Sequence, residues 1–468
     1  MWTAASRSSV SVRSTNEYEA AAGLMVEAAD LARATRAELL VRLADTFARR
    51  EVWVQAGKYV DGLLADLPRK NGWTLAEHAG DRSPDRMQRL LNHAAWDERV
   101  AMSEVRDFVV EYLADEFAVA VFDESAQEKK GNLTAGVKRQ YAGCVGKVTN
   151  AVNVVYCTYA TRRGHAIIGA VPYLPQEWAD DDARRERAGI DEAVTFRTKP
   201  QLALDLLTDL QAAQMAPPWA TGDEVYGRDS ALRGFCEDHE IGYVFEVACS
   251  FRVQLTTGRS VRADHAVGLL APDAWNYRSA GPGSKGERRY AWGWLATTSP
   301  RHHLLVRRSL TDPTELAYFS TYVPEGRPVT LPTLVNVAGM RWPVEEDFQT
   351  GKGHFGLDHS QVRLYAAIRR HIALTMTALA ICAVTAAAMR SKTSTLPPEP
   401  TGPDDIPPED PGLIALTVVE IKRLFNLITR TWRAASHHLH WTFWRRRHQA
   451  RARWYHQRTR LRRRTQTA

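Results

Sequence analysis

Hydrophobic and polar positions follow different periods in different parts of this chain. From about residue 17 to residue 113, apolar residues recur every three or four positions, which predicts a series of helices. Two amphipathic stretches, 201–211 and 230–238, predict helices in the middle of the chain. Around them, short apolar runs predict strands at 117–123, 150–160, 165–173, 218–222 and 243–249.

Three consecutive strands followed by two helix–strand units is the order of a ribonuclease-H-like sheet. We therefore predict an α/β fold with a ribonuclease-H-like mixed sheet, in which ligands bind where strands end. Over 251–326 the helical period disappears, and strands are expected at 288–297, 302–308 and 315–322, with a loop at 281–286. This stretch is predicted to be a β-rich insertion into the α/β core.

The N-terminal region contains a candidate helix-turn-helix. Two short helical patterns, 73–80 and 81–91, meet at a glycine, and Ser83 is the expected N-cap of the second helix. Arg82, Arg86 and Arg89 would then face DNA phosphates or base edges. The alternative is an ordinary helical hairpin with solvated arginines, because such hairpins are common without DNA binding.

One apolar segment raises the question of a membrane span. Residues 372–389 carry no charge, but they are rich in Ala and Thr, so their tendency to insert into a bilayer is weak. A buried core helix and no membrane association are predicted. Further along, 396–412 is acidic and Pro-rich, which predicts a linker.

Charge is distributed unevenly along the chain. The net charge of the 468 residues is +7, yet residues 422–468 contain 14 Lys and Arg and no Asp or Glu, which leaves a net charge of −7 on the first 421 residues. A concentrated basic segment favours a polyanionic partner, nucleic acid more often than an anionic membrane. The five cysteines form no close Cys-x-x-Cys pair, which favours a reducing cytoplasm over a disulfide scaffold or a zinc site.

Three carboxylates stand where predicted elements would bring them together. Asp123 and Asp223 each end a short apolar run, and Glu345 lies on a predicted helix, four residues after Arg341 and seven before Lys352. Two strand-end carboxylates and one helical carboxylate can converge around a pair of Mg²⁺ ions, which prefer oxygen ligands. Such a pair stabilises the attacking and leaving oxygens of a phosphodiester displacement. Taken singly, each carboxylate is equally explained by a turn or a surface ion pair.

The combination resembles the DDE transposases of bacterial insertion sequences. These are recognised partly by a signature of Arg, three residues, Glu, six residues and Lys, which here is Arg341, Glu345 and Lys352. The stretch 123–147 looks like the first-aspartate region of one branch, and 222–227 looks like the second-aspartate motif. The resemblance covers roughly residues 50–390.

The resemblance implies a function and its requirements. The chain is expected to be a DNA transposase that cleaves strands at transposon ends and transfers them to target DNA. The expected cofactor is Mg²⁺, as two ions that Mn²⁺ can replace. Expected partners are the double-stranded terminal inverted repeats, the target DNA and a second copy of the chain in a synaptic homodimer. The expected location is the bacterial cytoplasm, at the nucleoid.

The resemblance also assigns roles to residues. Asp123, Asp223 and Glu345 would bind the metal ions, and Arg341 and Lys352 would hold phosphates beside them. Neighbouring Glu124, Glu224 and Glu346 compete for the ligand positions. Since adjacent side chains of a strand face opposite ways, one member of each Asp-Glu pair is expected to point inward.

Further residues are predicted to contact DNA. Basic residues that follow the first aspartate form a loop or hairpin, for which a solvated hairpin is the alternative. Trp292 would stack on a displaced base, although strand periodicity by itself favours a core position. Arginines of the basic tail interleave with Trp and Tyr, which suits backbone contact and stacking. Besides Arg82, Arg86 and Arg89, the predicted DNA contacts are Lys129, Lys130, Lys138, Arg139, Trp292, Arg445, Arg446 and Arg447.

Two features depart from the family pattern. The broader signature has Tyr three positions before the Arg, where this chain has Ala338. Gly351 and Gly353 flank Lys352 and weaken the helix that must position it. Two alternatives therefore stay open, namely a transposase-derived DNA-binding protein without catalysis and a metal-dependent nuclease that does not join strands.

These observations give a predicted domain organisation. The core is divided by the insertion, with helical regions before and after it. The predicted parts are a disordered leader (1–15), a helical DNA-binding domain (16–115), the first part of the ribonuclease-H-like core (116–250), the β-rich insertion (251–326), the last core helices (327–395), the acidic Pro-rich linker (396–412) and a basic C-terminal extension (413–468).

Overall fold

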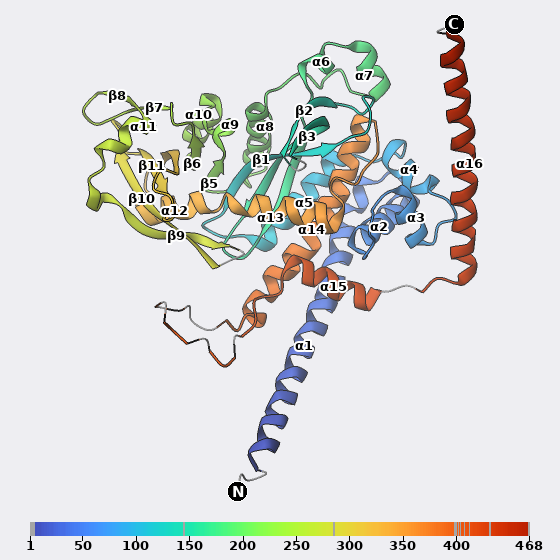
Figure 1. Cartoon of the computed structure of the whole chain (residues 1–468), viewed down its shortest axis with the longest axis horizontal. Helices are drawn as coiled ribbons and strands as arrows, with labels where there is room; N and C mark the ends of the chain where they lie inside the picture. The colour runs from blue at the N-terminus through green and yellow to red at the C-terminus, as the bar shows by residue number, and fades with distance from the viewer. Residues whose placement is uncertain are drawn as a thin grey trace.

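A ten-stranded mixed sheet forms the centre of the protein (Figure 1). In the computed structural model its strands follow the order β2-β3-β1-β5-β6-β12-β11-β10-β9, with β4 paired to β3 beside this path. The structure describes residues 5–143, 146–283, 286–396, 400, 402, 404–406, 408–410, 412–429 and 432–466. The strands are β1 (Val119–Glu128), β2 (Lys138–Ala142), β3 (Lys147–Ala160), β4 (His165–Pro172), β5 (Trp219–Gly222), β6 (Gly242–Val247), β9 (Asn276–Gly283), β10 (Gly286–Ala296), β11 (His302–Arg308) and β12 (Leu316–Tyr322).

The pairing within the sheet confirms the predicted fold class. Strand β1 pairs antiparallel with β3, which pairs antiparallel with β4, whereas β1, β5 and β6 are parallel. This is the expected ribonuclease-H-like arrangement of three antiparallel strands and two further parallel ones. Residues 119–123 of β1 are all buried, as expected for a central strand covered on both faces.

The predicted β-rich insertion continues the central sheet. Strand β12 pairs antiparallel with β6, and β11, β10 and β9 follow in turn, so four strands extend the core instead of forming a separate layer. A small two-stranded sheet, β7 (Arg252–Gln254) and β8 (Ser260–Arg262), lies at its start. The loop expected at 281–286 is instead a tight hairpin, since β9 runs to Gly283 and β10 begins at Gly286.

Helices cover the sheet on both sides (Figure 1). Helices α8 (Lys199–Ala212), α9 (Glu224–Gly227) and α10 (Ser230–Asp238) lie along one side. On the other side lie α5 (Glu98–Leu113), α12 (Leu331–Gly339), α13 (Trp342–Thr350) and α14 (Tyr365–Thr393). Short helices α6 (Gln176–Ala179), α7 (Asp182–Ala188) and α11 (Ala263–Ala266) complete this part of the chain.

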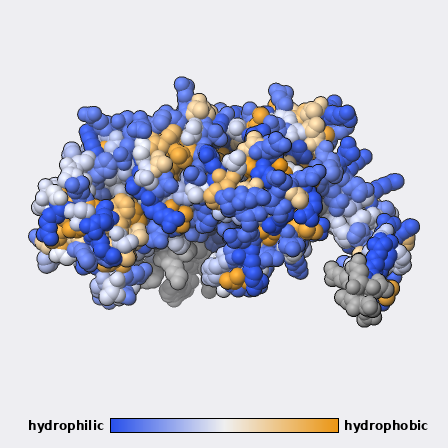
Figure 2. Space-filling model, turned by 90° about the horizontal axis from the view of Figure 1, so that it is seen from above, coloured by the Kyte–Doolittle hydropathy of each residue, from blue (hydrophilic) through white to orange (hydrophobic). Residues whose placement is uncertain are grey.

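Helix α14 is the only described helix that is long and apolar enough to cross a membrane by length and composition. Its most apolar window is 83% buried within the protein, where α14 contacts α1, α2, α4, α5, α15 and β4. The burial is that of a core helix, as the Ala- and Thr-rich composition predicts. The face seen in Figure 2 is mostly hydrophilic, with scattered hydrophobic groups.

The N-terminal helices are α1 (Ala5–Arg42), α2 (Arg50–Leu64), α3 (Gly72–Ala79) and α4 (Asp85–Asn92). Helix α1 begins within the range predicted as a disordered leader, because that range contains neither Gly nor Pro to stop a helix. Helices α3 and α4 form the expected hairpin around Gly80. Ser83 does not cap α4, since its hydroxyl donates to the Asp85 carboxylate and Pro84 occupies the N-cap position.

The C-terminal extension forms two helices, α15 (Val418–Thr429) and α16 (Ala435–Gln466). Helix α15 lies against α1, α2 and α14. Helix α16 stands at the edge of the molecule beside α3, as the red helix of Figure 1. Part of the predicted acidic linker, including residues 397–399, lies outside the described residues.

Candidate active site

Asp123 and Asp223 lie next to each other across the parallel strands β1 and β5. The paired register of these strands ends at Phe122 and Gly222, so each aspartate is the next residue after the last pair. Asp123 is not at a strand end as predicted, because β1 continues to Glu128 by pairing with β3. Asp223 caps α9, where its Oδ1 accepts the Val225 backbone N–H at 2.9 Å. The termination of β5 therefore brings the two carboxylates together.

Glu345 reaches the same region from the first turn of α13. Of the three consecutive acids on this helix, the other two are held by His165 of β4. His165 Nδ1 lies 2.9 Å from Asp347 Oδ1, and its Nε2 lies 3.3 Å from Glu346 Oε2. Burial opposes the charged imidazole, yet these two carboxylates raise the pKa of His165 to about 10. Glu345, by contrast, is exposed. Helix α13 is thus fixed to the sheet through Glu346 and Asp347, which leaves Glu345 available for a ligand.

The electrostatics of Asp123 show that these groups interact. Asp123 is 7% exposed, and burial, opposed by Arg341 but reinforced by Asp223 and Glu345, raises its pKa to about 7. Burial also raises the pKa of Asp223, and Glu124 adds to the effect. Arg341 Nη2 lies 3.5 Å from Asp123 Oδ2. Asp123 therefore lies close enough to Asp223 and Glu345 to be affected by their charge, with Arg341 as the nearby positive charge.

Glu124 belongs to a separate group beside this site that sequence reasoning did not identify. Its carboxylate accepts the Tyr226 hydroxyl at 2.8 Å and forms an ion pair with Lys199 at the start of α8. The expected alternation along β1 explains why Glu124 is engaged here while Asp123 contacts Arg341. Glu224, the neighbour of the second aspartate, is exposed.

The carboxylate oxygens of Asp123, Asp223 and Glu345 suit a hard divalent cation, although the three side chains do not converge on one metal position in this structure. Among the described residues, no three His, Cys, Asp or Glu side chains are arranged to hold a metal ion as they stand. Asp123 Oδ1 accepts the Glu124 backbone N–H at 2.7 Å, and Asp223 caps α9. Carboxylate oxygens are nevertheless the ligands that Mg²⁺ prefers, and a cation would favour the charged carboxylates that burial and, to a smaller extent, neighbouring carboxylates disfavour.

Arg341 and Lys352 do not share one regular helical face as the sequence predicts. Arg341 is the residue before α13, and Lys352 lies in a π-helical turn, Gly351–Phe355, that follows it. The two glycines beside Lys352 allow this wider turn, since they weaken the regular helix. The Lys352 side chain is half-buried and makes no ion pair within the described part of the chain.

A basic hollow lies beside helix α4. Its volume is about 500 Å³, and its lining includes Arg49, Arg86, Arg89 and His93, with Glu51 as the single acid. Arg82 is exposed at the turn before α4. Sequence reasoning identified Arg86 and Arg89 but not Arg49, which lies before α2 and joins them only in the folded chain. Four basic side chains around one hollow provide a surface for phosphates.

Two predicted DNA contacts are corrected by burial. Lys129 is 4% exposed, its Nζ donates to the Ser360 carbonyl at 2.7 Å, and burial lowers its pKa to about 8. Trp292 is 1% exposed and packs against Phe319, with ring centroids 6.0 Å apart. Both side chains belong to the interior because tertiary packing covers them, so neither is presented to DNA here.

The remaining predicted DNA contacts lie at the surface, with one exception. Lys130, Lys138 and Arg139 are exposed on β2 and the turn before it, with Lys138 Nζ 3.5 Å from a Glu177 carboxylate oxygen. Of the three predicted arginines in α16, Arg446 and Arg447 are exposed, whereas Arg445 is half-buried and forms an ion pair with Glu77.

Comparison with known proteins shows the family to which the chain belongs. The family described as DDE superfamily endonuclease matches residues 42–301, a range that contains Asp123 and Asp223 and ends before Glu345. The chain is 24% identical over 322 residues to the probable transposase for insertion sequence element IS701 of Microchaete diplosiphon, covering 67% of this chain and 78% of that protein. A piggyBac transposase synaptic complex with hairpin DNA, solved by cryo-EM, is similar with a TM-score of 0.38 and 12% identity, covering 84% of this chain and 76% of that chain. The family match extends over more than half of the chain, and this protein therefore belongs to the DDE superfamily of endonucleases.

Proposed function

We propose that this chain is the transposase of an insertion sequence, and that Asp123, Asp223 and Glu345 form its catalytic site. The observation that carries the proposal is geometric: Asp123 and Asp223 follow the last paired residues of the parallel strands β1 and β5, and Asp223 and Glu345 both act on the charge of the buried Asp123. The engagement of Glu346 and Asp347 by His165 supports Glu345 as the third member. The family membership and the similarity to a probable transposase support the reaction class.

The proposed chemistry has two steps in one site. Water attacks a phosphorus at the transposon end, and the bond to the 3′ oxygen breaks to leave a free 3′-OH. That hydroxyl then attacks a phosphorus of target DNA, so one phosphodiester bond forms as another breaks. When bound, two Mg²⁺ or Mn²⁺ ions would stabilise charge on the attacking and leaving oxygens. Asp123, Asp223 and Glu345 are the residues that would hold them.

Arg341 and Lys352 are proposed to position the DNA backbone. Arg341 Nε is buried without a hydrogen-bond partner among the described residues, which leaves an N–H for a phosphate oxygen. The Lys352 ammonium is proposed to contact a phosphate further along the strand. The duplex is proposed to lie over the exposed basic residues of α4 and of β2. Synapsis of two ends would require a homodimer, and the proposed location is the bacterial nucleoid.

Joining of pre-cut ends tests this proposal. Duplexes with free 3′-OH groups, taken from the DNA that borders the gene, would be incubated with Mg²⁺, a plasmid target and the purified protein. We expect joined products from the wild-type protein and none from Glu345→Gln. Cleavage without joining would favour a metal-dependent nuclease, and DNA binding without either reaction would favour a non-catalytic descendant.

The exposed neighbour Glu224 provides a matched control. Glu224→Gln removes one carboxylate next to Asp223 but outside the proposed cluster, so we expect joining to stay within about twofold of wild type. Loss of joining in both Asp223→Asn and Glu224→Gln would show that the assignment of the second ligand is wrong.

A further inference from the structure

The first part of α16 is docked on the helical hairpin α3–α4. Trp441 is fully buried, and its indole N–H donates to the Asp81 carbonyl at 2.9 Å. One residue earlier, His440 Nε2 lies 2.8 Å from the Arg82 carbonyl. These contacts join the turn between α3 and α4 to a helix some 360 residues later in the chain. The start of the basic helix is therefore part of the folded domain.

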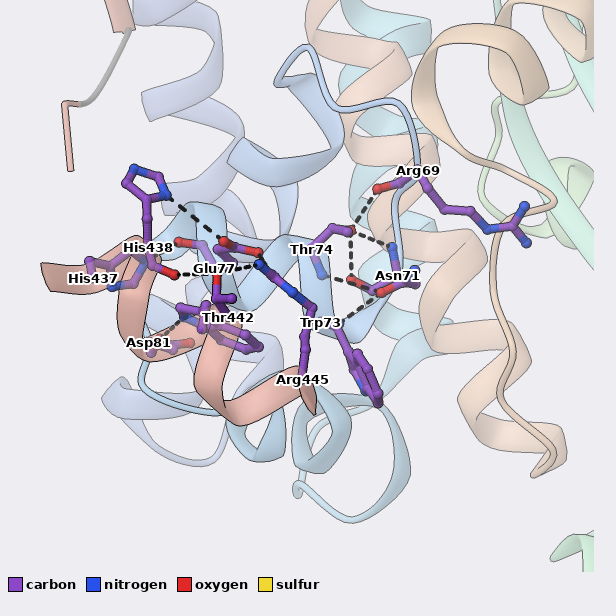
Figure 3. Close-up of polar contacts among 11 residues, drawn as sticks. Arg69, Asn71, Trp73, Thr74, Glu77, Asp81, His437, His438, Thr442 and Arg445 are labelled. Carbon is purple, nitrogen blue, oxygen red and sulfur yellow. Dashed lines mark hydrogen bonds and ion pairs between the residues drawn. The ribbon is translucent and has the colours of Figure 1, made fainter. Parts of the chain in front are cut away.

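An ion pair fixes the position of α16 along α3. Arg445 forms an ion pair with the Glu77 carboxylate, and His438 Nδ1 lies 3.9 Å from the same carboxylate (Figure 3). Next to this pair, Trp444 meets Trp73 edge-on, with ring centroids 4.9 Å apart. Charge and aromatic packing together hold one face of α16 against α3.

The hairpin turn is itself shaped around the C-terminal segment. Gly80 has φ +81°, which favours glycine, and a Cβ there would lie 2.8 Å from Arg433 Nη1. Arg433 Nη2 donates to the His78 carbonyl at 2.7 Å. The residue that lets the hairpin turn also makes room for an arginine that precedes α16.

Beyond the docked part, α16 presents exposed arginines. From His448 to Gln466 the helix continues for about 27 Å, at the usual rise per residue. Arg458 lies over the Trp454 and Tyr455 rings, which are themselves exposed. Further exposed arginines that make no ion pair within the described residues are Arg446, Arg447, Arg451, Arg453 and Arg460.

We propose that α16 and the α3–α4 hairpin form one duplex-DNA-binding unit. The ion pair of Glu77 with Arg445 positions the unit, and the exposed arginines of α16 and α4 contact the phosphates. Charge complementarity identifies the partner, since residues 422–468 contain 14 basic and no acidic residues. Arg445 is thus a positioning residue and not a DNA contact. The proposal rests on the proposed function in taking DNA as the polyanion.

A charge swap between Glu77 and Arg445 tests the positioning role. Binding of the full chain to a duplex from the DNA bordering the gene would be measured by fluorescence anisotropy without divalent cations. We expect Glu77→Arg and Arg445→Glu each to weaken binding by about tenfold. The double variant restores the ion pair at unchanged net charge, so its affinity should return to within about twofold of wild type.

Other outcomes would overturn the proposal. If Arg445 contacted DNA directly, Glu77→Arg would tighten binding by adding positive charge, and the double variant would stay weak. Should a single variant unfold, Trp441→Ala provides a second test, because it removes a buried contact between α16 and the α3–α4 hairpin without changing the net charge. We expect it to weaken DNA binding while the salt dependence stays the same, and unchanged affinity would contradict a joined unit.

The exposed arginines are tested separately from the docking. The triple variant Arg446→Gln, Arg447→Gln and Arg451→Gln should lower the slope of log K against log salt by about 2.7, if each arginine contacts one phosphate. An unchanged slope, or a preference for phosphatidylserine vesicles over duplex, would refute DNA as the partner. Since these assays measure binding alone, a failure of the proposed catalysis would leave their outcome unaffected.

Discussion

The carboxylate site and the unit formed by α16 and the α3–α4 hairpin differ in where they place their charged side chains. At the carboxylate site, Asp123 and Asp223 are drawn into the interior, and burial raises their pKa values. On α16, by contrast, positive charge is spread over exposed helix surface, and Arg445 forms an ion pair with Glu77 of α3. Burial makes the charged carboxylates of the first region unfavourable in the absence of a bound cation. The exposed arginines of the second region are solvated and carry no such cost.

This difference predicts two distinct ionic responses. Carboxylates such as the buried Asp123 and the half-buried Asp223 interact with divalent cations at short range, in surroundings that salt screens weakly. Exposed arginines release counterions when they meet DNA, so their binding weakens steeply as monovalent salt rises. Catalysis and DNA binding in this protein should therefore be separable by the choice of ion.

Removal of divalent metal should have the largest effect that distinguishes the two regions. Chelation with EDTA should lower DNA cleavage at least about 10³-fold, because charge on the reacting oxygens would lose its stabilisation. DNA binding should change by less than about twofold in the same buffer. Cleavage by gel assay and binding by anisotropy would be measured on one protein preparation. Cleavage that persists in EDTA would contradict the role given to the carboxylates.

Loss of His165 should have the next largest effect. His165→Ala leaves the buried Asp347 without its cationic partner, with the Thr158 hydroxyl at 2.9 Å as a remaining donor. We expect the free energy of unfolding to fall by about 3 kcal/mol, measured by denaturant titration. DNA cleavage should fall as well, because α13 would lose its attachment to β4. The exposed His265 supplies the control, and His265→Ala should have almost no effect on stability.

His371 of α14 bridges α2 and the turn at Gly356, and it should make stability depend on pH. Its Nε2 donates to the Gly356 carbonyl at 3.0 Å, so its Nδ1 accepts the Tyr59 hydroxyl at 2.9 Å. Burial, with a smaller effect of Lys129, lowers its pKa to about 4. Between pH 6.5 and 4 the unfolded chain binds a proton that the folded chain excludes. Stability should therefore fall by about 3 kcal/mol as pH decreases through this window.

Thermal unfolding across that pH window measures the His371 effect. Gln keeps a donor and an acceptor but does not titrate, so His371→Gln should flatten the profile between pH 6.5 and 4. A variant that keeps the full wild-type slope would show that other groups cause the pH dependence.

The smallest expected effect is a gain in stability. At pH 8, above its raised pKa, Asp123 is charged and buried among other carboxylates, so Asp123→Asn removes an unfavourable charge. We expect the metal-free variant to be more stable than wild type by about 1–3 kcal/mol. Added Mg²⁺ should raise the melting temperature of the wild type but not of the variant. A less stable variant would mean that the contact with Arg341 outweighs the burial of the charge.

The fold was largely predictable because most elements carry their own local pattern. The core strands β1, β3, β4, β5 and β6 follow apolar runs, and α8 and α10 follow amphipathic ones. Strand β2 was missed because it is an exposed edge strand of the sequence Lys-Arg-Gln-Tyr-Ala, without an alternating apolar face. The continuity of the insertion with the sheet was missed as well, since it depends on the pairing of β12 with β6.

The candidate site was predictable only in part, and the reason is sequence separation. Asp123, Asp223 and Glu345 could be named from run ends and from a resemblance. His165 could not, because its partners lie 181 and 182 residues away, and the Glu77–Arg445 pair spans 368 residues. Lys129 and Trp292 were assigned to DNA by residue type, while tertiary packing places both in the interior.

An excision assay tests the central claim most directly. A marker flanked by the DNA that borders the gene would be exposed to the wild-type protein, to Asp123→Asn, Asp223→Asn and Glu345→Gln, and to the Glu224→Gln control. Excision by the wild type and the control alone is the expected result, and it would show that three carboxylates from distant segments act as one site. Excision that survives any of the three substitutions, with the protein folded and bound to DNA, would contradict the account.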